Sequence, residues 1–367
     1  MPGSSVQRPL DTTRPLPVAD LDHVLLHTQG LWEALHGARL FVTGGTGFFG
    51  RWMIESFLRA NEEYALGARV LLLTRDEARL AAGAPHIVDH AAVDVVTGDI
   101  RTLASTDIRC TDVLHMAAET TYPPGGVSSA AAFDSAVVGT ERVLALAHQC
   151  RCRRLLFTSS GAVYGRQPPE CRRLDEESRL APPTWDVESG YAQGKRAAEF
   201  LCASAAAERG LQATLARCFA FVGPLLALDA NYAIGNFIRD ALWHPAISVQ
   251  GDGAAVRSYL YAADLAVWLW HVFIRGVPGR PYNLGSSFDI SIGDLAQAVV
   301  DCLCPGKPVQ VALSAVAGAL PARYVPDTRR AEEELGLKVL VNLEEGIRRT
   351  AAWSGWRPAP AQGAQAR

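Results

Sequence analysis

The sequence lacks a long hydrophobic run. Its most hydrophobic stretch, Leu265–Trp270, is far shorter than the roughly 20 residues that a membrane-spanning helix needs. The opening residues, Met1–Pro9, also lack the apolar core of a secretory signal. We therefore expect a cytoplasmic protein with no membrane partner.

An excess of charge of either sign is absent as well. The formal net charge is −3 at pH 7, with 20% charged and 49% hydrophobic residues, which is ordinary for a soluble globular protein. Nucleic acids bind basic surfaces, so this balance favours a small-molecule partner and no nucleic acid. The 367 residues suffice for one large domain or two closely packed ones.

A zinc-binding pattern of cysteines and histidines is also missing. Among the eight cysteines, Cys150 and Cys152 are separated by one residue, as are Cys302 and Cys304. No histidine cluster accompanies either pair at the spacing of a zinc site. We therefore expect reduced thiols and no bound metal.

What the sequence does contain is a glycine-rich turn between a strand-like and a helix-like segment. Gly44 allows a tight turn, Gly47 lets the backbone approach a pyrophosphate, and Gly50 lets the helix pack closely. Backbone N–H groups at the helix start, at Phe48 and Phe49, would face the phosphates. The pattern predicts that these five residues bind a dinucleotide cofactor. Ordinary turns also carry such glycines, so the prediction depends on the rest of the chain.

Strand-like and helix-like segments alternate after this turn. The expected strands are Arg69–Thr74, Val93–Thr97, Asp112–Met116 and Leu155–Thr158, and the expected helices include Arg51–Ala60 and Phe133–Gln149. Such alternation implies parallel strands joined by right-handed crossovers. We therefore predict an α/β fold with a Rossmann-type, doubly wound parallel sheet that binds ligands beyond the carboxyl ends of its strands.

The chain divides into four segments. We expect an N-terminal extension over 1–37, a dinucleotide-binding Rossmann domain over 38–217, a smaller, mixed α/β C-terminal substrate lobe mainly over 218–356, and a disordered tail over 357–367. A loop near 166–188 is expected to face the substrate, and some segments of the lobe to return to the Rossmann sheet. Helical pieces in the extension, interrupted at Gly30, should pack on their own chain. A lid or a subunit contact is the alternative.

Three side chains predict acid–base chemistry. Tyr191 and Lys195 are four residues apart in a helix-like segment, so the phenol and the ammonium share one face. A tyrosine has a pKa of ~10 in water, and a neighbouring cation lowers this pKa. Ser160 lies just after the expected strand Leu155–Thr158, where it can place a hydroxyl beside the same reacting oxygen. Tyr-x-x-x-Lys is common on exposed helices, so its combination with the glycine turn carries the prediction.

The end of the expected strand Arg69–Thr74 bears on the choice of cofactor. An NAD enzyme usually has an acidic residue there that binds the ribose hydroxyls. This chain has Thr74 and Arg75, a neutral side chain and a cation, which suit the 2′-phosphate of NADP. We expect NADP or NAD, with NADP slightly favoured. The other interpretation is a solvated arginine at a helix start, followed by Asp76 as a helix charge.

In this order, the glycine turn, Ser160, Tyr191 and Lys195 resemble the extended short-chain dehydrogenase/reductases, in particular the NAD(P)-dependent nucleotide-sugar epimerase/dehydratase family. The resemblance covers about Arg39–Trp356, most of the chain. It implies an enzyme that removes a hydride from a sugar carbon or delivers it there. By this resemblance, Tyr191 handles the hydroxyl proton, Lys195 also binds the nicotinamide ribose, and Ser160 hydrogen-bonds the sugar oxygen.

Further motifs extend the resemblance to cofactor contacts. A Gly-Asp-Ile triplet matches the family motif in which Asp99, beside Ile100, hydrogen-bonds the adenine. The residues after the expected strand at 112–116 match the motif beside the cofactor and contribute Ala117 and Ala118. All four residues are therefore expected to bind the cofactor.

The resemblance also implies a substrate site and a partner. Arg257 would clamp a nucleotide diphosphate, a task suited to a planar guanidinium, and Asn236 would contact the nucleotide or its phosphate. We place Glu119 and Thr120 with these substrate-binding residues. The expected partners are a sugar nucleotide and a second copy of the chain, in a homodimer built through the helices around Phe133–Gln149 and Tyr191–Glu208.

The sequence departs from the family directly after the catalytic hydroxyl. The 4,6-dehydratases of the family carry an Asp-Glu pair there and the decarboxylases a Glu, but this chain has Gly161 and Ala162, which cannot move a proton. These residues argue against both reactions. Ala136 and Ala220 also stand where the family usually has Asn. The change at Ala220 leaves the nucleotide half of the substrate open.

We therefore expect a nucleotide-sugar epimerase that works by hydride transfer through a keto-sugar intermediate. The alternatives are an NADPH-dependent ketosugar reductase acting on a sugar nucleotide, and a reductase or dehydrogenase of a non-nucleotide carbonyl substrate. A non-catalytic coenzyme sensor would be expected to have lost Tyr191 or Lys195, and both are present. The sequence names neither the sugar, nor its base, nor the carbon attacked.

Overall fold

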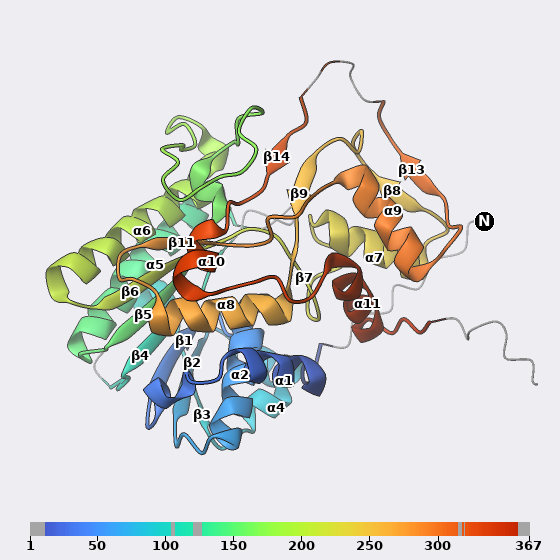
Figure 1. Ribbon diagram of the computed structural model, residues 1–367. Coiled ribbons are helices and arrows are strands. Elements are labelled where there is room, and N and C mark those ends of the chain that lie inside the picture. Colours follow the sequence, from blue (N-terminus) through green and yellow to red (C-terminus); the bar gives the residue numbers. More distant parts are fainter. Residues whose placement is uncertain (1–11, 104–106, 120–126, 315–317, 319, 359–367) are drawn as a thin grey trace, which may run out of the picture.

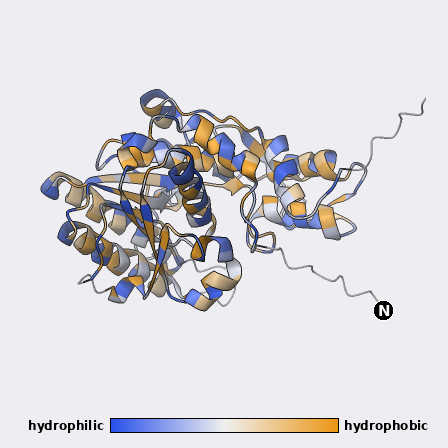
Figure 2. Cartoon of the chain, turned by 90° about the horizontal axis from the view of Figure 1, so that it is seen from below, coloured by the Kyte–Doolittle hydropathy of each residue, from blue (hydrophilic) through white to orange (hydrophobic). Residues whose placement is uncertain are grey.

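Figure 1 shows the computed structural model of the chain, which describes residues 12–103, 107–119, 127–314, 318 and 320–358. A large sheet flanked by helices forms one lobe. A smaller lobe of helices and short strands lies to one side of it, as the second viewing direction of Figure 2 also shows. Residues 1–11 of the expected extension and 359–367 of the expected tail lie outside the described residues. Within the described part, no helix has the length and hydrophobicity to cross a membrane.

The large sheet has seven parallel strands in the order β11-β6-β5-β4-β1-β2-β3. The strands are β1 (Arg39–Thr43), β2 (Arg69–Thr74), β3 (Val93–Thr97), β4 (Asp112–His115), β5 (Arg154–Ser160), β6 (Gln212–Cys218) and β11 (Pro281–Leu284). The chain builds outward from β1 to β3 and then returns to β4 on the other side of β1. This doubly wound order confirms the predicted Rossmann-type sheet, in which ligands bind where the strand order reverses.

The observed strands agree closely with the predicted ones. β2 and β3 have the predicted bounds, and β4 ends at His115 instead of Met116. β5 is longer than predicted because its whole length, from Arg154 to Ser160, pairs with β6. Ser160 is therefore the last residue of a central strand, at the edge where ligands bind.

The two faces of the sheet bury different side chains, because successive strand residues point to opposite sides. One face carries Leu40, Val42, Val70, Leu72, Leu114 and Leu156, and the other carries Phe41, Leu71, Leu73, Val113, Leu155 and Phe157. The helices α2 (Phe48–Glu63) and α8 (Ala262–Arg275) cover the first face, and α5 (Ser129–Gln149) and α6 (Gly190–Arg209) cover the second (Figure 1). Burial on both sides explains why these strands are almost entirely apolar.

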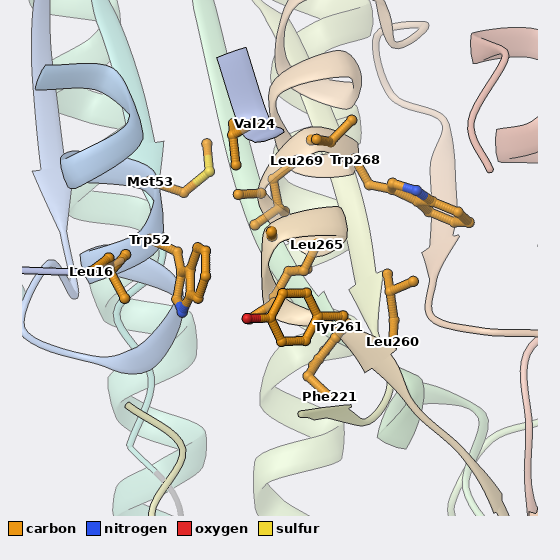
Figure 3. Close-up of a cluster of buried hydrophobic side chains, with 14 of the residues drawn as sticks. Leu16, Val24, Trp52, Met53, Phe221, Leu260, Tyr261, Leu265, Trp268 and Leu269 are labelled. Atoms are coloured by element: carbon orange, nitrogen blue, oxygen red, sulfur yellow. The ribbon is translucent and has the colours of Figure 1, made fainter. Parts of the chain in front are cut away.

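The described part of the N-terminal extension packs against α2 and α8. Its helix α1 (Val18–His27) is separated from the 3-10 helix η1 (Trp32–Leu35) by Gly30, which has a φ of +76°. Figure 3 shows Leu16 beside Trp52 of α2, and Val24 close to Leu269 of α8. These side chains belong to the larger hydrophobic core, so this segment completes the first face of the sheet.

A buried carboxylate ties the same segment to the small lobe. Asp20 accepts hydrogen bonds from the Tyr261 hydroxyl at 2.7 Å and from Nη1 of Arg349 at 2.9 Å. Burial raises the pKa of Asp20, and the two donors oppose this rise. Because Tyr261 ends β10 (Leu260–Tyr261) and Arg349 lies on α11 (Leu343–Trp353), three distant segments meet at one carboxylate.

The small lobe is built from helices and three small sheets. Besides β10 and α11 it contains β7 (Phe221–Val222), α7 (Ala233–Trp243), β8 (Ile247–Val249), β9 (Val256–Ser258), β12 (Asp289–Ser291), α9 (Ile292–Leu303), β13 (Val309–Val311) and β14 (Arg323–Tyr324). β9 lies between β12, which is antiparallel to it, and β14, which is parallel. The register places Tyr324 beside Arg257.

Short helices complete the connections. They are α3 (Glu77–Gly83), α4 (Pro85–Val88), η2 (Ile100–Thr102), η3 (Gly161–Tyr164), η4 (Val187–Ser189) and α10 (Arg329–Leu335). The segment at 166–188 pairs in parallel with the chain that leaves β14, through a bridge between Leu174 and Pro326. There the buried Leu174 donates its N–H to Val325 O at 2.9 Å and accepts the Asp327 N–H at 2.7 Å. These bonds fix the position of the segment that follows Tyr324.

Candidate active site

The glycine turn joins β1 to α2 at the reversal of strand order. Gly44 has a φ of +74°, and a Cβ there would lie 2.5 Å from the Ala117 nitrogen and from the Met116 carbonyl carbon, just beyond β4. Only glycine fits this position. A Cβ at Gly50 would lie 2.2 Å from Gly44 O. Gly50 therefore allows the close packing predicted for the start of α2, but the first turn of the helix packs on the glycine turn and not on the strand.

The N-terminus of α2 follows the turn without a side-chain cap, since Gly47 occupies the cap position. The first N–H groups of a helix, here including those of Phe48 and Phe49, have no intrahelical acceptor. Together with the positive end of the helix dipole they suit a phosphate group. Phe49 also packs edge-on against Phe221 of β7, with ring centroids 5.3 Å apart, so the turn contacts the small lobe.

The end of β2 carries the cation expected from the sequence. Thr74 is buried, and its hydroxyl donates to Asp76 O at 3.1 Å. The Asp76 carboxylate accepts the Arg79 N–H at 2.9 Å and caps α3. Arg75 has 64% of its side chain exposed and forms an ion pair with Glu119, which follows β4. The Arg75 guanidinium thus spans the ends of β2 and β4.

Asp99 and Ile100 follow β3. The Asp99 carboxylate accepts hydrogen bonds from the backbone N–H of Arg101 at 2.8 Å and from its Nη2 at 2.7 Å. The side-chain bonds are the main cause that lowers the pKa of Asp99 to about 2. Ile100 is buried against Gly139 of α5, where a Cβ would lie 3.1 Å from Ile100 Cγ2. The contact of this pair with adenine stays a prediction.

A buried histidine organises the end of β4. The ring nitrogens of His115 lie 2.9 Å from Thr43 Oγ1 and 3.0 Å from Thr140 Oγ1. Burial lowers the pKa of His115 to about 3, so its imidazole is neutral at neutral pH. The Ala117 N–H donates to the same Thr43 hydroxyl at 3.2 Å. These bonds lock β4 to β1 and α5, and they leave Ala118 exposed beyond the strand end.

Ser160, Tyr191 and Lys195 come together at the end of β5. Tyr191 lies in the first turn of α6, and its phenol is close enough to Ser160 for the serine side chain to lower the pKa of Tyr191. Lys195 is buried one turn further along α6, and its Nζ donates to Thr158 O at 2.7 Å. The ammonium also lies 4.6 Å from the centroid of the Phe157 ring. The three side chains that the sequence singled out are therefore neighbours.

The structure differs from the sequence-based expectation on the pKa of Tyr191. We expected Lys195 to lower it, but burial raises it to about 12, and the hydrogen bond with Ser160 opposes the rise. The ammonium is held by the Thr158 carbonyl, 5.9 Å from the centroid of the Tyr191 ring. Burial lowers the pKa of Lys195 to about 8, so it remains mostly protonated at neutral pH. The chain alone therefore keeps Tyr191 as a neutral phenol.

Arg257 lies close to this cluster from the small lobe. Its Nη1 donates to Val256 O at 2.8 Å and to Ala322 O at 3.3 Å. Burial raises the pKa of Tyr324, and both a hydrogen bond with Ser160 and the charge of Arg257 oppose the rise. Tyr324 pairs with Arg257 in the register of β14 and β9, and a Cβ on Gly161, the neighbour of Ser160, would lie 2.6 Å from the Tyr324 hydroxyl oxygen.

The other predicted substrate residues are less closely grouped. Asn236 lies on α7, where its Oδ1 accepts a hydrogen bond from Nη1 of Arg239 at 3.3 Å. Glu119 is paired with Arg75, a predicted cofactor residue. Thr120 lies outside the described residues.

Sequence reasoning missed two residues of this site. His115 stands inside a motif that the resemblance identified, and its place directly before the cofactor residues could have drawn attention to it. Tyr324 carries no such signal. It reaches Ser160 only because β14 pairs with β9, a pairing of two very short strands that the sequence pattern does not predict.

The residues at the strand ends fit a nicotinamide dinucleotide. The space that a Cβ at Gly44 would fill and the N-terminus of α2 suit a pyrophosphate. Among the described residues, no group of His, Cys, Asp and Glu side chains could hold a metal ion, and the eight cysteines are free thiols. When bound, the coenzyme supplies hydride transfer. The chain supplies a proton donor or acceptor at the Tyr191 hydroxyl.

Comparisons with known proteins place this site in a family. A profile of the NAD dependent epimerase/dehydratase family matches residues 40–285. UDP-glucuronic acid decarboxylase 1 of Xenopus tropicalis is 26% identical over 312 residues, which are 85% of this chain and 71% of the relative. The similarity to a decarboxylase does not support our expectation that decarboxylation is excluded. That expectation rests on Gly161 and Ala162 alone.

Solved structures share the fold. The dTDP-glucose 4,6-dehydratase DesIV of Streptomyces venezuelae, with NAD and TYD bound, superposes with a TM-score of 0.71 at 26% identity, over 86% of this chain and 96% of that chain. A UDP-N-acetylglucosamine 4-epimerase from Methanobrevibacter ruminantium gives a TM-score of 0.72 at 20% identity, over 86% and 97%, a likeness of fold alone.

The matched region extends from β1 to β11. It therefore includes the complete parallel sheet, the glycine turn and the cluster at the end of β5. The chain belongs to the NAD dependent epimerase/dehydratase family, and it is an enzyme of the extended short-chain dehydrogenase/reductase type.

Proposed function

We propose that the chain is a nucleotide-sugar epimerase. It would oxidise a sugar hydroxyl to a ketone by hydride transfer and return the hydride to the opposite face of the keto-sugar. The observation that carries this proposal is the cluster at the end of β5, where Tyr191 lies beside Ser160 and Lys195 is buried behind them. Oxidation and reduction of an alcohol need only such a proton-transferring group and a partner for the oxygen.

Each residue of the cluster has one role in this proposal. Tyr191 removes the proton of the sugar hydroxyl during oxidation and returns it during reduction, at its own hydroxyl oxygen. Ser160 holds the reacting oxygen by a hydrogen bond. Lys195 binds the nicotinamide ribose and supplies positive charge. Because burial places the pKa of Tyr191 at about 12, ionisation of the phenol requires further positive charge at the site.

The absence of a proton-transferring side chain at 161 and 162 favours epimerisation over elimination or decarboxylation. Gly161 and Ala162 occupy the two positions after Ser160. The carboxylate of Glu199, on α6, is bound by Nη2 of Arg217 at 2.7 Å and by the Ser159 hydroxyl. It is therefore committed to a structural ion pair.

Arg257 favours a nucleotide diphosphate as the non-reacting half of the substrate. Within the described residues, its hydrogen bonds use only Nη1, so the rest of the guanidinium can bind phosphate oxygens. Asn236, together with Glu119 and Thr120, would contact the remainder of the ligand. UDP- and dTDP-linked hexoses are the substrates to test first, because the relatives named above act on such compounds.

The cofactor-binding residues are those of the strand ends. We propose Gly44, Gly47 and the start of α2 for the pyrophosphate, and Asp99 with Ile100 for the adenine. Arg75 would bind a 2′-phosphate, which favours NADP over NAD. This exposed cation also supports a second candidate, an NADPH-dependent ketosugar reductase.

We further propose a homodimer that pairs α5 and α6 with the same helices of a second copy. Phe200 on α6 is 72% exposed and Phe133 on α5 is 40% exposed. Large apolar side chains exposed on neighbouring helices are typical of a protein interface.

The first prediction concerns turnover. The isolated enzyme, with its bound coenzyme, should interconvert a UDP- or dTDP-hexose with its epimer without consuming added coenzyme. Tyr191→Phe should lower kcat by about 10²–10⁴ because proton transfer is lost, whereas Tyr64→Phe, the same change at a distant exposed tyrosine, should not. Consumption of NADPH in proportion to product would identify a reductase instead. Release of carbon dioxide from UDP-glucuronic acid would identify a decarboxylase.

The second prediction concerns the glycine turn. Gly44→Ala and Gly37→Ala both place an L residue at positive φ, which costs about 1–2 kcal/mol. Only Gly44→Ala also brings a Cβ within 2.5 Å of the backbone beyond β4, because nothing lies within 4 Å of a Cβ at Gly37. Calorimetric titration should therefore find coenzyme affinity reduced tenfold or more in Gly44→Ala alone. Equal affinities of the two variants would contradict the proposed pyrophosphate site.

The third prediction concerns cofactor choice. Arg75→Ala should weaken NADP binding about tenfold or more, because a charge-assisted hydrogen bond to phosphate is worth ~1.5–3 kcal/mol. NAD binding should change little. Arg79→Ala, which removes an exposed cation from the adjoining helix α3, serves as the control. Fluorescence titration with both coenzymes checks this, and an equal loss for NAD and NADP would count against the role of Arg75.

The fourth prediction concerns the homodimer. Sedimentation velocity should give twice the chain mass of 39.4 kDa. Phe200→Arg should shift the protein to monomer, since it would bury a charge in the interface. Phe288→Arg is the matched control. Phe288 is also 72% exposed, but it lies between β11 and β12, outside the helices α5 and α6. A dimer that persists in Phe200→Arg would refute this interface.

A further inference from the structure

Cysteines from two distant segments meet at the amino ends of β4 and β5. Cys110 lies two residues before β4, and Cys152 lies two residues before β5. The Sγ atoms of Cys110 and Cys152 are 3.4 Å apart, although the two residues are separated by 42 positions in the chain. The fold therefore forms a pair of thiols that the spacing of the cysteines in the sequence does not reveal.

The backbone around this pair has the geometry that a disulfide needs. β4 and β5 are parallel neighbours, and the Arg153 N–H donates to Thr111 O at 2.8 Å just before their first paired residues. Each cysteine directly precedes one of these two residues, so the register of the sheet sets Cys110 opposite Cys152. Adjacent strands lie about 4.8 Å apart. Disulfides join residues whose Cα atoms are roughly 4.4–6.8 Å apart, so the sheet already provides the required separation.

The two sulfur atoms also face each other at the edge of the core. The Cys152 thiol donates to Cys110 O at 3.5 Å, in addition to its contact with Cys110 Sγ. Cys110 is 5% and Cys152 is 9% exposed, whereas Cys202 in the same hydrophobic core is 0% exposed. A small oxidant therefore reaches the pair more readily than it reaches Cys202.

Cys150 is the alternative partner for Cys152. It directly follows α5 and is half-buried. Its thiol donates to Ile108 O at 3.3 Å, whereas the sulfur atoms of Cys110 and Cys152 are directed at each other. The observed contacts therefore favour a bond between Cys110 and Cys152.

We propose that Cys110 and Cys152 are a site of reversible oxidation, at which hydrogen peroxide closes a disulfide between the ends of β4 and β5. The Cys152 thiolate attacks one peroxide oxygen, the O–O bond breaks, and the released hydroxide takes the former Cys152 proton and leaves as water. Cys152 is then a sulfenic acid. Cys110 attacks Cys152 Sγ, so that the S–S bond forms, the S–O bond breaks, and the Cys110 proton leaves with the hydroxyl group as a second water.

This step balances without any further reactant. The two thiols lose two electrons and two protons together, and one peroxide molecule is reduced to two waters. A small thiol reverses the modification by thiol–disulfide exchange.

The disulfide would lie far from the cofactor and the proposed catalytic residues. Ser160 ends β5, the strand that begins two residues after Cys152, so at ~3.3 Å per residue about 25 Å separate Cys152 from Ser160. The loop that the bond closes contains β4 and α5. Closing a loop restricts the unfolded chain, so we expect the oxidised protein to be more stable while its coenzyme site is unchanged.

Peptide mapping by mass spectrometry identifies the bond. The full chain is treated with hydrogen peroxide, and its remaining thiols are then alkylated after unfolding. One cross-linked peptide should join Cys110 to Cys152, and the number of alkylated cysteines should fall from eight to six. Dithiothreitol should restore all of them. Cys150→Ser should cross-link as the wild type does, and Cys110→Ala should not. A bond between Cys150 and Cys152, or a sulfinic acid at Cys152 with Cys110 still reduced, would overturn the proposal.

Thermal unfolding tests whether the bond fits the native sheet. The cross-linked wild type should melt about 3–5 °C above the reduced protein. Cys110→Ala, treated in the same way, should show no such rise, which controls for oxidation of the other cysteines. Calorimetric titration should give the same coenzyme affinity before and after cross-linking. A lower Tm of the cross-linked protein, or a changed coenzyme affinity, would contradict the proposal. These measurements use no sugar nucleotide, so their outcome is independent of the proposed function.

Discussion

The position of the Tyr191 phenol beside Ser160 is the constraint on which the rest of the site depends. It joins the first turn of α6 to the end of β5. Close packing holds that turn in place. The Gly190 N–H donates to Ser129 Oγ at 2.9 Å, and a Cβ on Gly194 would lie 3.0 Å from that of Ala136. The start of α6 is thus wedged against α5, so the phenol has little freedom to leave the strand end.

A buried polar network also holds α6, the helix that carries Tyr191, against the sheet. Arg217 of β6 binds Glu199 of α6 through Nη2 at 2.7 Å and donates to the Tyr164 hydroxyl from Nη1 at 2.9 Å. That hydroxyl donates to Asn283 Oδ1 of β11 at 2.8 Å. Buried charges are costly unless they are paired and hydrogen-bonded, and here every partner comes from a different element. The network therefore couples the position of α6 to the sheet and keeps its carboxylate away from the chemistry.

The sequence predicts the parts of the molecule that local patterns determine. The apolar strands, the glycine turn and the spacing of Tyr191 and Lys195 each follow from a rule that acts over a few residues. β5 is longer than predicted because pairing with β6 extends it to Ser160. The raised pKa of Tyr191, the ion pair of Arg75 with Glu119 and the arrival of Tyr324 could not be predicted. Each depends on burial or on segments far apart in the chain.

Gly161 illustrates the limit most clearly. The sequence presents it as a missing carboxylate, which argues against elimination and decarboxylation. The structure adds that the vacated side-chain space is filled by the Tyr324 hydroxyl and the ring of Phe219. The glycine in the sequence therefore indicates only that the carboxylate is missing at this position. The fold shows that side chains from distant segments, Tyr324 and Phe219, fill the space.

The central claim is that the sugar reacts between Ser160 and Tyr191 while Arg257, on β9, binds its diphosphate. A crystal structure of the Tyr191→Phe enzyme with its coenzyme and a UDP-hexose tests it most directly. The account predicts a sugar hydroxyl oxygen at about 3 Å from Ser160 Oγ and diphosphate oxygens on the guanidinium of Arg257. A hexose bound away from the end of β5, or a diphosphate that does not touch Arg257, would contradict it.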